Sequence, residues 1–319
     1  MNNYFENVLA TALSKCEGRY TYDDECRQGF SRIYPFTTEN ISGYIDKFDL
    51  NGKSLLTVGS SGDQVINASL FDCCDQTVVD ICPYTKFYFY LKKACILSFS
   101  LNEYMDFFCY NDYPKFCHDN KNVFSKDKFA SIKDLLRLMD YESFLFWDEV
   151  FSLYKPEKVR RELFSSDEDR SFVLQGMNLY MKDEESFNTA KVKIRSINPR
   201  FICDDIMNVT LNRRYDNIWL SNLGLYFGID KLKDLVDRLD PFVSEKMLLC
   251  YLYKTEEKTK YKKEWSEIYD LKRLRTTLGD YSTSLETFCG VRGILFEDEK
   301  YDRDSVLIYD KNSKVLVKK

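Results

Sequence analysis

The first third of the chain alternates short apolar runs with glycine-rich or polar turns. Ser54 to Val58 is an apolar run bounded by Asn51-Gly52 before it and by a glycine-serine turn, residues 59–62, after it. Such a run predicts a buried strand, and we expect a helix to begin near Asp63. A second apolar run, Thr77-Val-Val-Asp-Ile81, ends in a single acid. It predicts the next strand.

Beyond this unit the pattern changes twice. Residues 100 to about 185 carry apolar positions at helical spacing with few strand signals. The helix expected from Pro83 to Ile96 is apolar on more than one face, so we expect it to be buried. Strand signals return in the last third, together with a helix Ile229–Leu239 that Pro241 stops. These strand signals lie at residues 200–206, 215–222, 246–253, 285–291 and 305–309, the last two as a hairpin.

This order predicts an α/β fold, with a doubly wound, mostly parallel seven-stranded sheet whose last strand is antiparallel. Residues 1–50 form an N-terminal helical segment in which Thr37 or Thr38 caps a helix near Glu39. The polar and aromatic residues of the stretch 32–40 form either a lid or substrate wall, or an ordinary N-capped helix that leads into the sheet. Residues 51–99 and 191–319 form the sheet domain, and residues 100–190 form a helical insertion that covers the cleft.

The turn after the first strand is the main candidate for chemistry. A strand, a glycine turn, a helix and a strand ending in an acid make up a nucleotide-binding unit. Gly59 and Gly62 let the backbone turn sharply against a ligand, and the start of the helix offers unpaired N–H groups. Asp80 can accept hydrogen bonds from both ribose hydroxyls. A parallel-sheet crossover without a ligand gives the same pattern, so both interpretations stay open at this point.

Composition and charge exclude several classes of function. The net charge is −5, so we predict no nucleic-acid partner, although residues 254–263 form a local basic segment. No apolar run reaches membrane-spanning length and the amino terminus has no signal pattern. We therefore expect a cytoplasmic protein with no integral membrane segment. Its oligomeric state is left open.

Cysteine and histidine usage narrows the chemistry further. The number of cysteines, 11, is odd, and several lie in apolar runs, which favours reduced thiols. Pairs such as Cys73-Cys74 lack zinc-site spacing, so we predict no metal site. The single histidine, His118, lies in a polar segment with no glycine-flanked serine nearby. Nucleophilic catalysis of the Ser-His or Cys-His type is therefore not expected.

The order of these features resembles the class I S-adenosylmethionine-dependent transferases, which have a methyltransferase-like Rossmann fold. The glycine turn, Asp80, the acidic pair Asp204-Asp205 and the polar pair Ser221-Asn222 follow one another as that family's motifs do. The resemblance implies that the turn approaches the methionine part of the cofactor, that Asp80 holds the ribose, and that one acid of the pair lies by the adenine. The implied S-adenosylmethionine-binding residues are Thr57, Gly59, Ser60, Ser61, Gly62, Asp63, Gln64, Asp80, Ile81, Asp204 and Asp205.

The glycine turn departs from the usual family pattern. Methyltransferases commonly have an acid and then three glycines at alternate positions, and these places hold Thr57, Gly59, Ser61 and Asp63. The chain is more similar to a branch related to the enzymes that transfer a 3-amino-3-carboxypropyl group to diacylglycerol in betaine-lipid synthesis. That branch has a serine-rich turn and an Asp two residues before an Asn-Pro pair. Here Asp80-Ile-Cys-Pro83 keeps the acid and the proline, with cysteine in place of asparagine.

Transfer from a sulfonium needs mainly alignment, because the leaving group is a neutral thioether. Ser221, Asn222 and Tyr226 are candidates to orient an acceptor, or else form a helix cap and a core tyrosine. Asp63 either binds the cofactor ammonium or caps the helix. We expect a methyl or aminocarboxypropyl transferase with a small-molecule or lipid acceptor. The alternative is a non-catalytic protein of the same fold that binds S-adenosylmethionine or a nucleotide; a nicotinamide-linked oxidoreductase would need a complete Gly-x-Gly-x-x-Gly loop.

Overall fold

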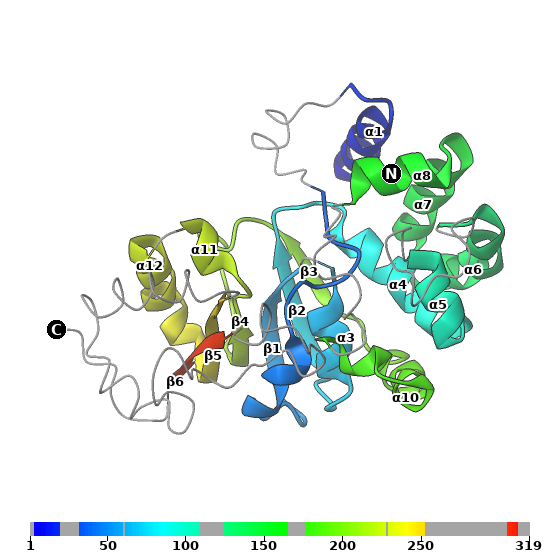
Figure 1. The fold of residues 1–319 in the computed structure, drawn as a ribbon. Helices are drawn as coiled ribbons and strands as arrows, with labels where there is room; N and C mark the ends of the chain where they lie inside the picture. Colours follow the sequence, from blue (N-terminus) through cyan, green and yellow to red (C-terminus); the bar gives the residue numbers. More distant parts are fainter. Residues whose placement is uncertain are drawn as a thin grey trace.

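The centre of the structure, a computed structural model, is a mixed six-stranded sheet in the order β3-β2-β1-β4-β5-β6 (Figure 1). The structure describes residues 3–19, 32–59, 61–108, 124–164, 177–227, 229–252 and 305–311. The strands are β1 (Ser54–Val58), β2 (Asp75–Asp80), β3 (Arg200–Cys203), β4 (Tyr215–Trp219), β5 (Val243–Leu252) and β6 (Ser305–Asp310). The first five strands are parallel, and β6 is antiparallel to β5.

The predicted α/β sheet, mostly parallel with an antiparallel last strand, is confirmed. Six strands lie within the described residues, and the further strand expected at residues 285–291 falls outside them. From β1 the chain steps to β2 and β3 on one side, and then returns to β4 on the other side of β1. The loops that leave β1 and β4 at their carboxyl ends therefore diverge. Such a reversal of strand order is where open α/β sheets form a crevice for ligands.

Strand β2 separates two hydrophobic clusters. Successive strand side chains point to opposite faces, and Val78 packs into one cluster while Val79 packs into the other. The Val78 cluster includes helices α1 (Asn3–Cys16), α3 (Asp63–Ser69), α4 (Thr85–Ser98), α5 (Leu101–Phe108), α6 (Lys126–Met139), α7 (Tyr141–Leu153), α8 (Pro156–Leu163) and α10 (Glu184–Ile194). The Val79 cluster includes α12 (Ile229–Leu239), with α11 (Leu223–Phe227) beside it.

Helix α4 is buried on nearly all sides, as its apolar residues on more than one face predict. The Phe87 ring stacks on Phe146 of α7 at 4.7 Å between centroids, and the indole N–H of Trp147 donates to the Phe87 carbonyl at 2.8 Å. Each such ring removed from water contributes roughly 1.5–3 kcal/mol. The helices that follow α4 therefore fold back onto it.

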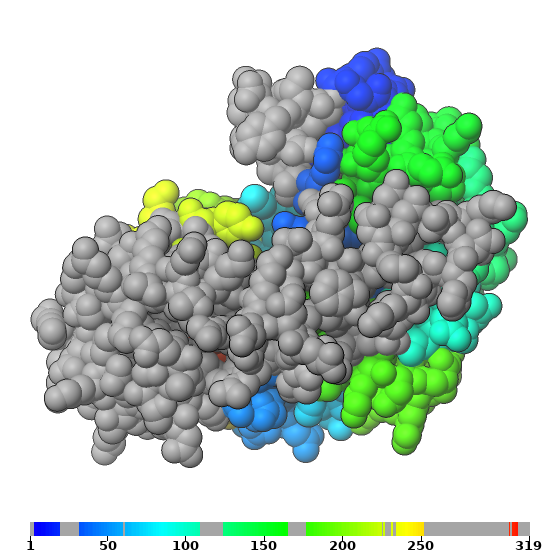
Figure 2. All heavy atoms as spheres, viewed as in Figure 1, coloured from blue at the N-terminus to red at the C-terminus, as the bar shows by residue number. Residues whose placement is uncertain are grey.

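The expectation that residues 100–190 cover the cleft stays a prediction, because residues 109–123 and 165–176 lie outside the described residues. Helices α5 to α8 pack on α4 and on α1, to one side of the sheet (Figure 1). Figure 2 shows α1, in blue, and α8, in green, forming one continuous surface at that end of the molecule. The apolar faces of α4 need this cover, so the helical block is placed by α4.

The prediction of a regular helix that begins near Glu39 is wrong. Two 3-10 turns occupy its place, η1 (Ile41–Gly43) and η2 (Ile45–Lys47). The Thr37 hydroxyl does accept from the Glu39 N–H at 3.1 Å, as a capping threonine would. The Asn40 N–H, however, donates to the Tyr251 hydroxyl on β5 at 2.9 Å. This long-range bond holds the segment against the sheet.

A buried ion pair joins the glycine turn to α4. The Lys92 ammonium lies 2.5 Å from Asp63 Oδ1, and both side chains are 0% exposed. Asp63 also accepts from the Tyr180 hydroxyl at 2.7 Å, the Thr37 N–H at 2.5 Å and the Ser61 hydroxyl at 2.9 Å. Burial lowers the pKa of Lys92 below its ordinary value, while Asp63 acts in the opposite direction. One carboxylate thus connects four segments of the chain.

Helix α4 does not cross a membrane, and none of the other helices in the described ranges is long and apolar enough to do so.

Breaking the ion pair should destabilise the whole fold. Asp63→Asn and Lys92→Met each leave one buried charged or polar group without its partner, so we expect each to lower the free energy of unfolding by about 3–5 kcal/mol. The double variant should lose less than the sum of the two. Urea unfolding measures all three.

Lys193→Met is the matched control, because Lys193 pairs with Asp72 at 2.5 Å in a partly exposed position. Its loss should cost less than about 1 kcal/mol. If Asp63→Asn were no more destabilising than this control, the ion pair would not have the structural role assigned to it.

Candidate functional site

A cavity of about 520 Å³ lies at the carboxyl ends of β1 to β4. Its walls include Val58 from the end of β1 and residues 79–82 from the end of β2. Residues 204–206 after β3 and 221–223 after β4 line it as well, and its remaining side comes from residues 32–39, here called the wall segment. The volume is in the range of sites that hold a cofactor-sized molecule. The cavity therefore lies where the reversal of strand order predicts one.

The glycine turn fits closely around the end of β2. A Cβ on Gly59 would lie 2.5 Å from Asp80 Oδ2 and 2.6 Å from Thr85 Cγ2, so only glycine fits there. Gly62 precedes α3 with a φ of +77°, a conformation that favours glycine. Gly59 thus allows close approach to Asp80, and Gly62 allows the turn. Ser60, between them, lies outside the described residues.

Asp80 is fixed at the edge of the cavity. Its Oδ1 accepts from the Cys82 N–H at 2.8 Å, and its carbonyl accepts from the Asp204 N–H at 3.1 Å. The neighbouring Ile81 is 50% exposed and also lines the cavity. A carboxylate held beside an exposed aliphatic side chain can bind hydroxyl groups and cover one face of a ring.

Asp204 and Asp205, the acidic pair after β3, have different roles. Asp205 Oδ1 accepts from the Met207 N–H at 2.9 Å, and its Oδ2 accepts from the Asn208 amide at 3.1 Å, so Asp205 holds its own loop. Asp204 is exposed, and its Oδ1 accepts from the Asp205 N–H at 2.8 Å. Both line the cavity. Asp204 is the better placed of the two to contact a ligand.

Gly59 and Gly62 are not part of the cavity lining, and neither are four other residues of the predicted cofactor set. Thr57 is buried in β1 between Val78 and Trp219 of the neighbouring strands. Ser61 and Asp63 belong to the buried ion-pair network. The fourth, Gln64, is buried with no hydrogen-bond partner for its amide among the described residues.

Asp63 lies in the first turn of α3, as the interpretation of it as an acid at a helix N-terminus expects, but it is also enclosed by other donors. Its two oxygens accept hydrogen bonds from four donors of the protein itself. A carboxylate offers about four lone-pair positions. Little capacity remains for a cofactor ammonium, and the side chain joins several segments of the chain in addition to being the first-turn acid of α3.

The three predicted acceptor-orienting residues do lie at one end of the cavity. Ser221 has a φ of +57°, and its carbonyl accepts from the Tyr251 N–H at 2.8 Å. Asn222 is partly buried and Tyr226 is 69% exposed at the rim. A non-glycine residue in this conformation costs roughly 1–3 kcal/mol and persists only where its surroundings hold it. The strained Ser221 backbone aims its hydroxyl at the wall segment.

Glu39 of the wall segment receives that hydroxyl; the sequence pattern suggests a substrate wall over residues 32–40 but does not single out Glu39. The Ser221 hydroxyl donates to Glu39 Oε1, and the Tyr44 hydroxyl donates to Oε2 at 3.3 Å. Glu39 is 2% exposed and lines the cavity. In sequence it looked like an acid in the first turn of a helix. Only its long-range partner, Ser221, shows that it is a buried carboxylate in the site.

The cavity is acidic. Its described lining contributes four carboxylates and one guanidinium, that of Arg32. The four carboxylates belong to Glu39, Asp80, Asp204 and Asp205. Arg32 lies 3.8 Å from Glu162, outside the lining. Such a lining favours a cation or a donor of hydrogen bonds over a phosphate.

The chemistry that the described residues offer is binding rather than nucleophilic attack. Cys82 lines the cavity, but burial and the neighbouring Asp80 raise the pKa of its thiol well above the ordinary value, so the thiol stays protonated. The parts of the chain that the structure describes contain no group of three or more side chains placed to hold a metal ion. The lone His118 lies outside those parts, as does the basic segment 254–263.

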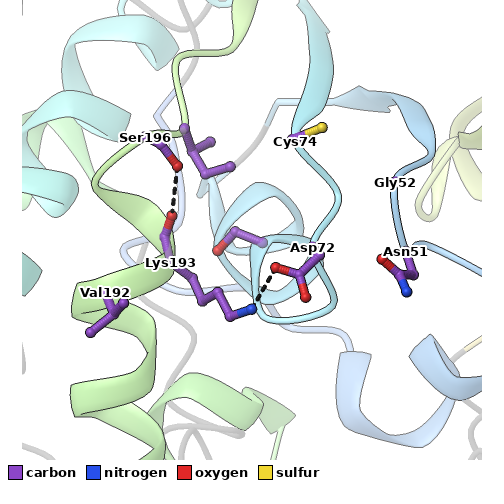
Figure 3. Close-up of a pocket in the computed structure, with 9 residues that line it drawn as sticks. Asn51, Gly52, Asp72, Cys74, Val192, Lys193 and Ser196 are labelled. Carbon is purple, nitrogen blue, oxygen red and sulfur yellow. Dashed lines mark hydrogen bonds and ion pairs between the residues drawn. The ribbon is translucent and has the colours of Figure 1, made fainter.

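A second cavity, of about 330 Å³, lies at the amino ends of β1 and β2 (Figure 3). It is lined by residues that precede β1 and β2 and by the end of α10. Figure 3 shows the Lys193 ammonium donating to Asp72, at 2.5 Å, so the two charges neutralise each other. Ligands of open α/β sheets bind at the carboxyl ends of the strands. The larger, acidic cavity is therefore the candidate site.

No protein-family model matches the chain, and a search of the curated proteins finds no match either. The function therefore has to be inferred from the cavity and its side chains.

Substituting Gly59 should damage the site. In Gly59→Ala the new methyl group would overlap Asp80 Oδ2, so we expect the Asp80 carboxylate to move and the protein to lose about 1–3 kcal/mol of stability. Urea unfolding measures the loss. A high-resolution structure of the variant locates the carboxylate.

Gly52→Ala is a control for Gly59→Ala, because it strains the backbone without placing the new methyl group against another atom. Gly52 has a φ of +69° with nothing within 4 Å of its built Cβ. We expect a backbone cost of roughly 1–2 kcal/mol there, with Asp80 in its original position. An unmoved Asp80 in Gly59→Ala would show that the turn does not fix the carboxylate.

Proposed function

We propose that the chain is an S-adenosylmethionine-dependent transferase that moves a methyl or a 3-amino-3-carboxypropyl group to a small-molecule or lipid acceptor. The fold that goes with this proposal is the doubly wound, seven-stranded Rossmann-type sheet. Its remaining strand would come from residues 285–291.

The observation that carries the proposal is the position of Asp80. Its carboxylate ends β2, lies against Gly59 and faces a cavity at the reversal of strand order. A carboxylate in this position can accept hydrogen bonds from both hydroxyls of a ribose. Ile81 and Asp204 line the adjoining part of the cavity, where an apolar side chain and a polar group suit an adenine. We therefore place the adenosine in the part of the cavity at the carboxyl ends of β2 and β3.

The acidic lining favours this cofactor over a dinucleotide. S-Adenosylmethionine carries a sulfonium, an ammonium and a carboxylate, for a net charge of about +1, whereas a dinucleotide brings a doubly charged pyrophosphate. Opposite unit charges about 4 Å apart near a protein surface attract by roughly 4 kcal/mol, and like charges repel by the same amount. Four lining carboxylates against one guanidinium therefore support a cationic ligand.

The chain's own part in such a reaction is to bind and align. When bound, the cofactor supplies an electrophilic carbon and a neutral thioether leaving group. Asp80 would hold the ribose, and the turn at Gly59 would fix how deeply the adenosine enters. Ser221 and Asn222 lie at the end of β4, where they can orient an acceptor atom toward the transferred carbon. Alignment of two reactants in this way can supply about 7–11 kcal/mol of the barrier reduction.

Calorimetric titration tests the cofactor assignment. We expect micromolar binding of S-adenosylmethionine and S-adenosylhomocysteine, because Asp80 contacts the ribose that both share. Asp80→Ala should weaken both by roughly 100-fold, since each hydrogen bond to a charged group contributes about 1.5–3 kcal/mol. Asp75→Ala, at the other end of the same strand and paired there with Arg213 at 2.6 Å, should bind both normally. Failure of the folded wild-type protein to bind either compound would refute the proposal.

The nucleoside product identifies the transferred group. Release of S-adenosylhomocysteine during turnover with candidate acceptors indicates methyl transfer, and release of methylthioadenosine indicates aminocarboxypropyl transfer. Binding without either product, over a broad set of acceptors, would favour a non-catalytic binding protein of the same fold.

A further inference from the structure

Glu39 is the most enclosed carboxylate of the cavity lining. It is 2% exposed, whereas Asp204 is exposed and Asp80 is partly exposed. It reaches the cavity from the wall segment, and the Ser221 hydroxyl donates to its Oε1. Its position depends on a strained residue, because Ser221 holds a φ of +57°. Ser221 therefore holds an unfavourable backbone conformation in which its hydroxyl donates to the Glu39 carboxylate.

The strand order divides the cavity into two ends. Asp80 ends β2 and Asp204 follows β3, both on one side of β1, whereas Ser221 follows β4 on the other side. Glu39 is bonded to Ser221 and therefore belongs to the β4 end. If adenosine takes the β2–β3 end, the β4 end remains for the sulfur and its substituents. A carboxylate there would lie beside a centre that is positively charged before transfer and neutral after it.

We infer that Glu39 is a specificity residue that recognises the positive charge of the sulfonium. This inference rests on the proposed function and extends it. Glu39 would favour the charged cofactor over its neutral thioether product, which would help product leave once the charge is gone. The Ser221 hydroxyl would position the carboxylate for this role. An attraction between unit charges in a partly buried setting is strong enough for a preference of roughly tenfold or more.

Three ligands with the same adenosine and amino-acid parts test the inference by calorimetry. S-Adenosylmethionine has the charged sulfonium, sinefungin has a protonated amine in its place, and S-adenosylhomocysteine has a neutral sulfur. We expect the wild-type protein to bind the two charged ligands at least about tenfold more tightly than the neutral one. Glu39→Gln should remove most of this ratio and change the affinity for S-adenosylhomocysteine less than about threefold.

Two further variants serve as controls. Glu149→Gln removes the same charge from an exposed position on α7, so all three affinities should stay at wild-type values. Glu39→Asp keeps the negative charge but places it on a shorter side chain. Its preference for charged over neutral ligands should therefore lie between those of the wild-type protein and Glu39→Gln. If Glu39→Gln does not fold, the wild-type ratios and Glu39→Asp decide the question.

The outcomes distinguish the two proposals. Equal weakening of all three ligands in Glu39→Gln would mean that Glu39 contacts a part they share, and it would overturn the inference. A wild-type protein that binds neutral and charged ligands equally well would overturn it too, while leaving the cofactor assignment intact. No binding of any of the three would refute the proposed function itself.

Discussion

The carboxylate of Asp63 and the ammonium of Lys92 form an ion pair from which water is excluded, and the site is built around it. Charges buried in this way are tolerated only when hydrogen bonds compensate for lost hydration. Asp63 obtains them from the wall segment through Thr37, from the glycine turn through Ser61, and through Tyr180 from the 3-10 turn η4 (Leu179–Met181). Because one carboxylate needs all these donors, the segments that carry them have to meet.

The cavity forms because these segments are held together at Asp63. Thr37 is held at Asp63, and a short distance along the chain the Asn40 N–H is held by Tyr251 of β5. The wall segment is thereby stretched across the carboxyl ends of the strands, which brings Glu39 to Ser221. Behind it, Gly59 fits against Asp80 so closely that no side chain could lie between them. The polar groups of the site are positioned by bonds formed behind the lining.

The helical block has a separate physical origin. Helix α4 carries aromatic and aliphatic residues around most of its surface, and one sheet face cannot cover them all. Helices α1 and α5 to α8 cover the remainder, which draws them to one side of the sheet. Lys92 lies on this same helix, so the packing of the block also fixes the partner of Asp63. Core packing and site geometry thus share one element.

The sequence by itself determined the local features: the alternation of strands and helices, the burial of α4, the glycine turn and Asp80 at the end of β2. Each depends on periodicity or turn chemistry within a few residues. Tertiary structure alone decided that Asp63 is enclosed by the protein's own donors and that Glu39 belongs to the site. Their partners are distant in sequence: Tyr180 lies 117 positions from Asp63, and Ser221 lies 182 positions from Glu39. Whether an acid is buried, and which donor it contacts, depends on how distant segments pack. A local sequence pattern does not contain this information.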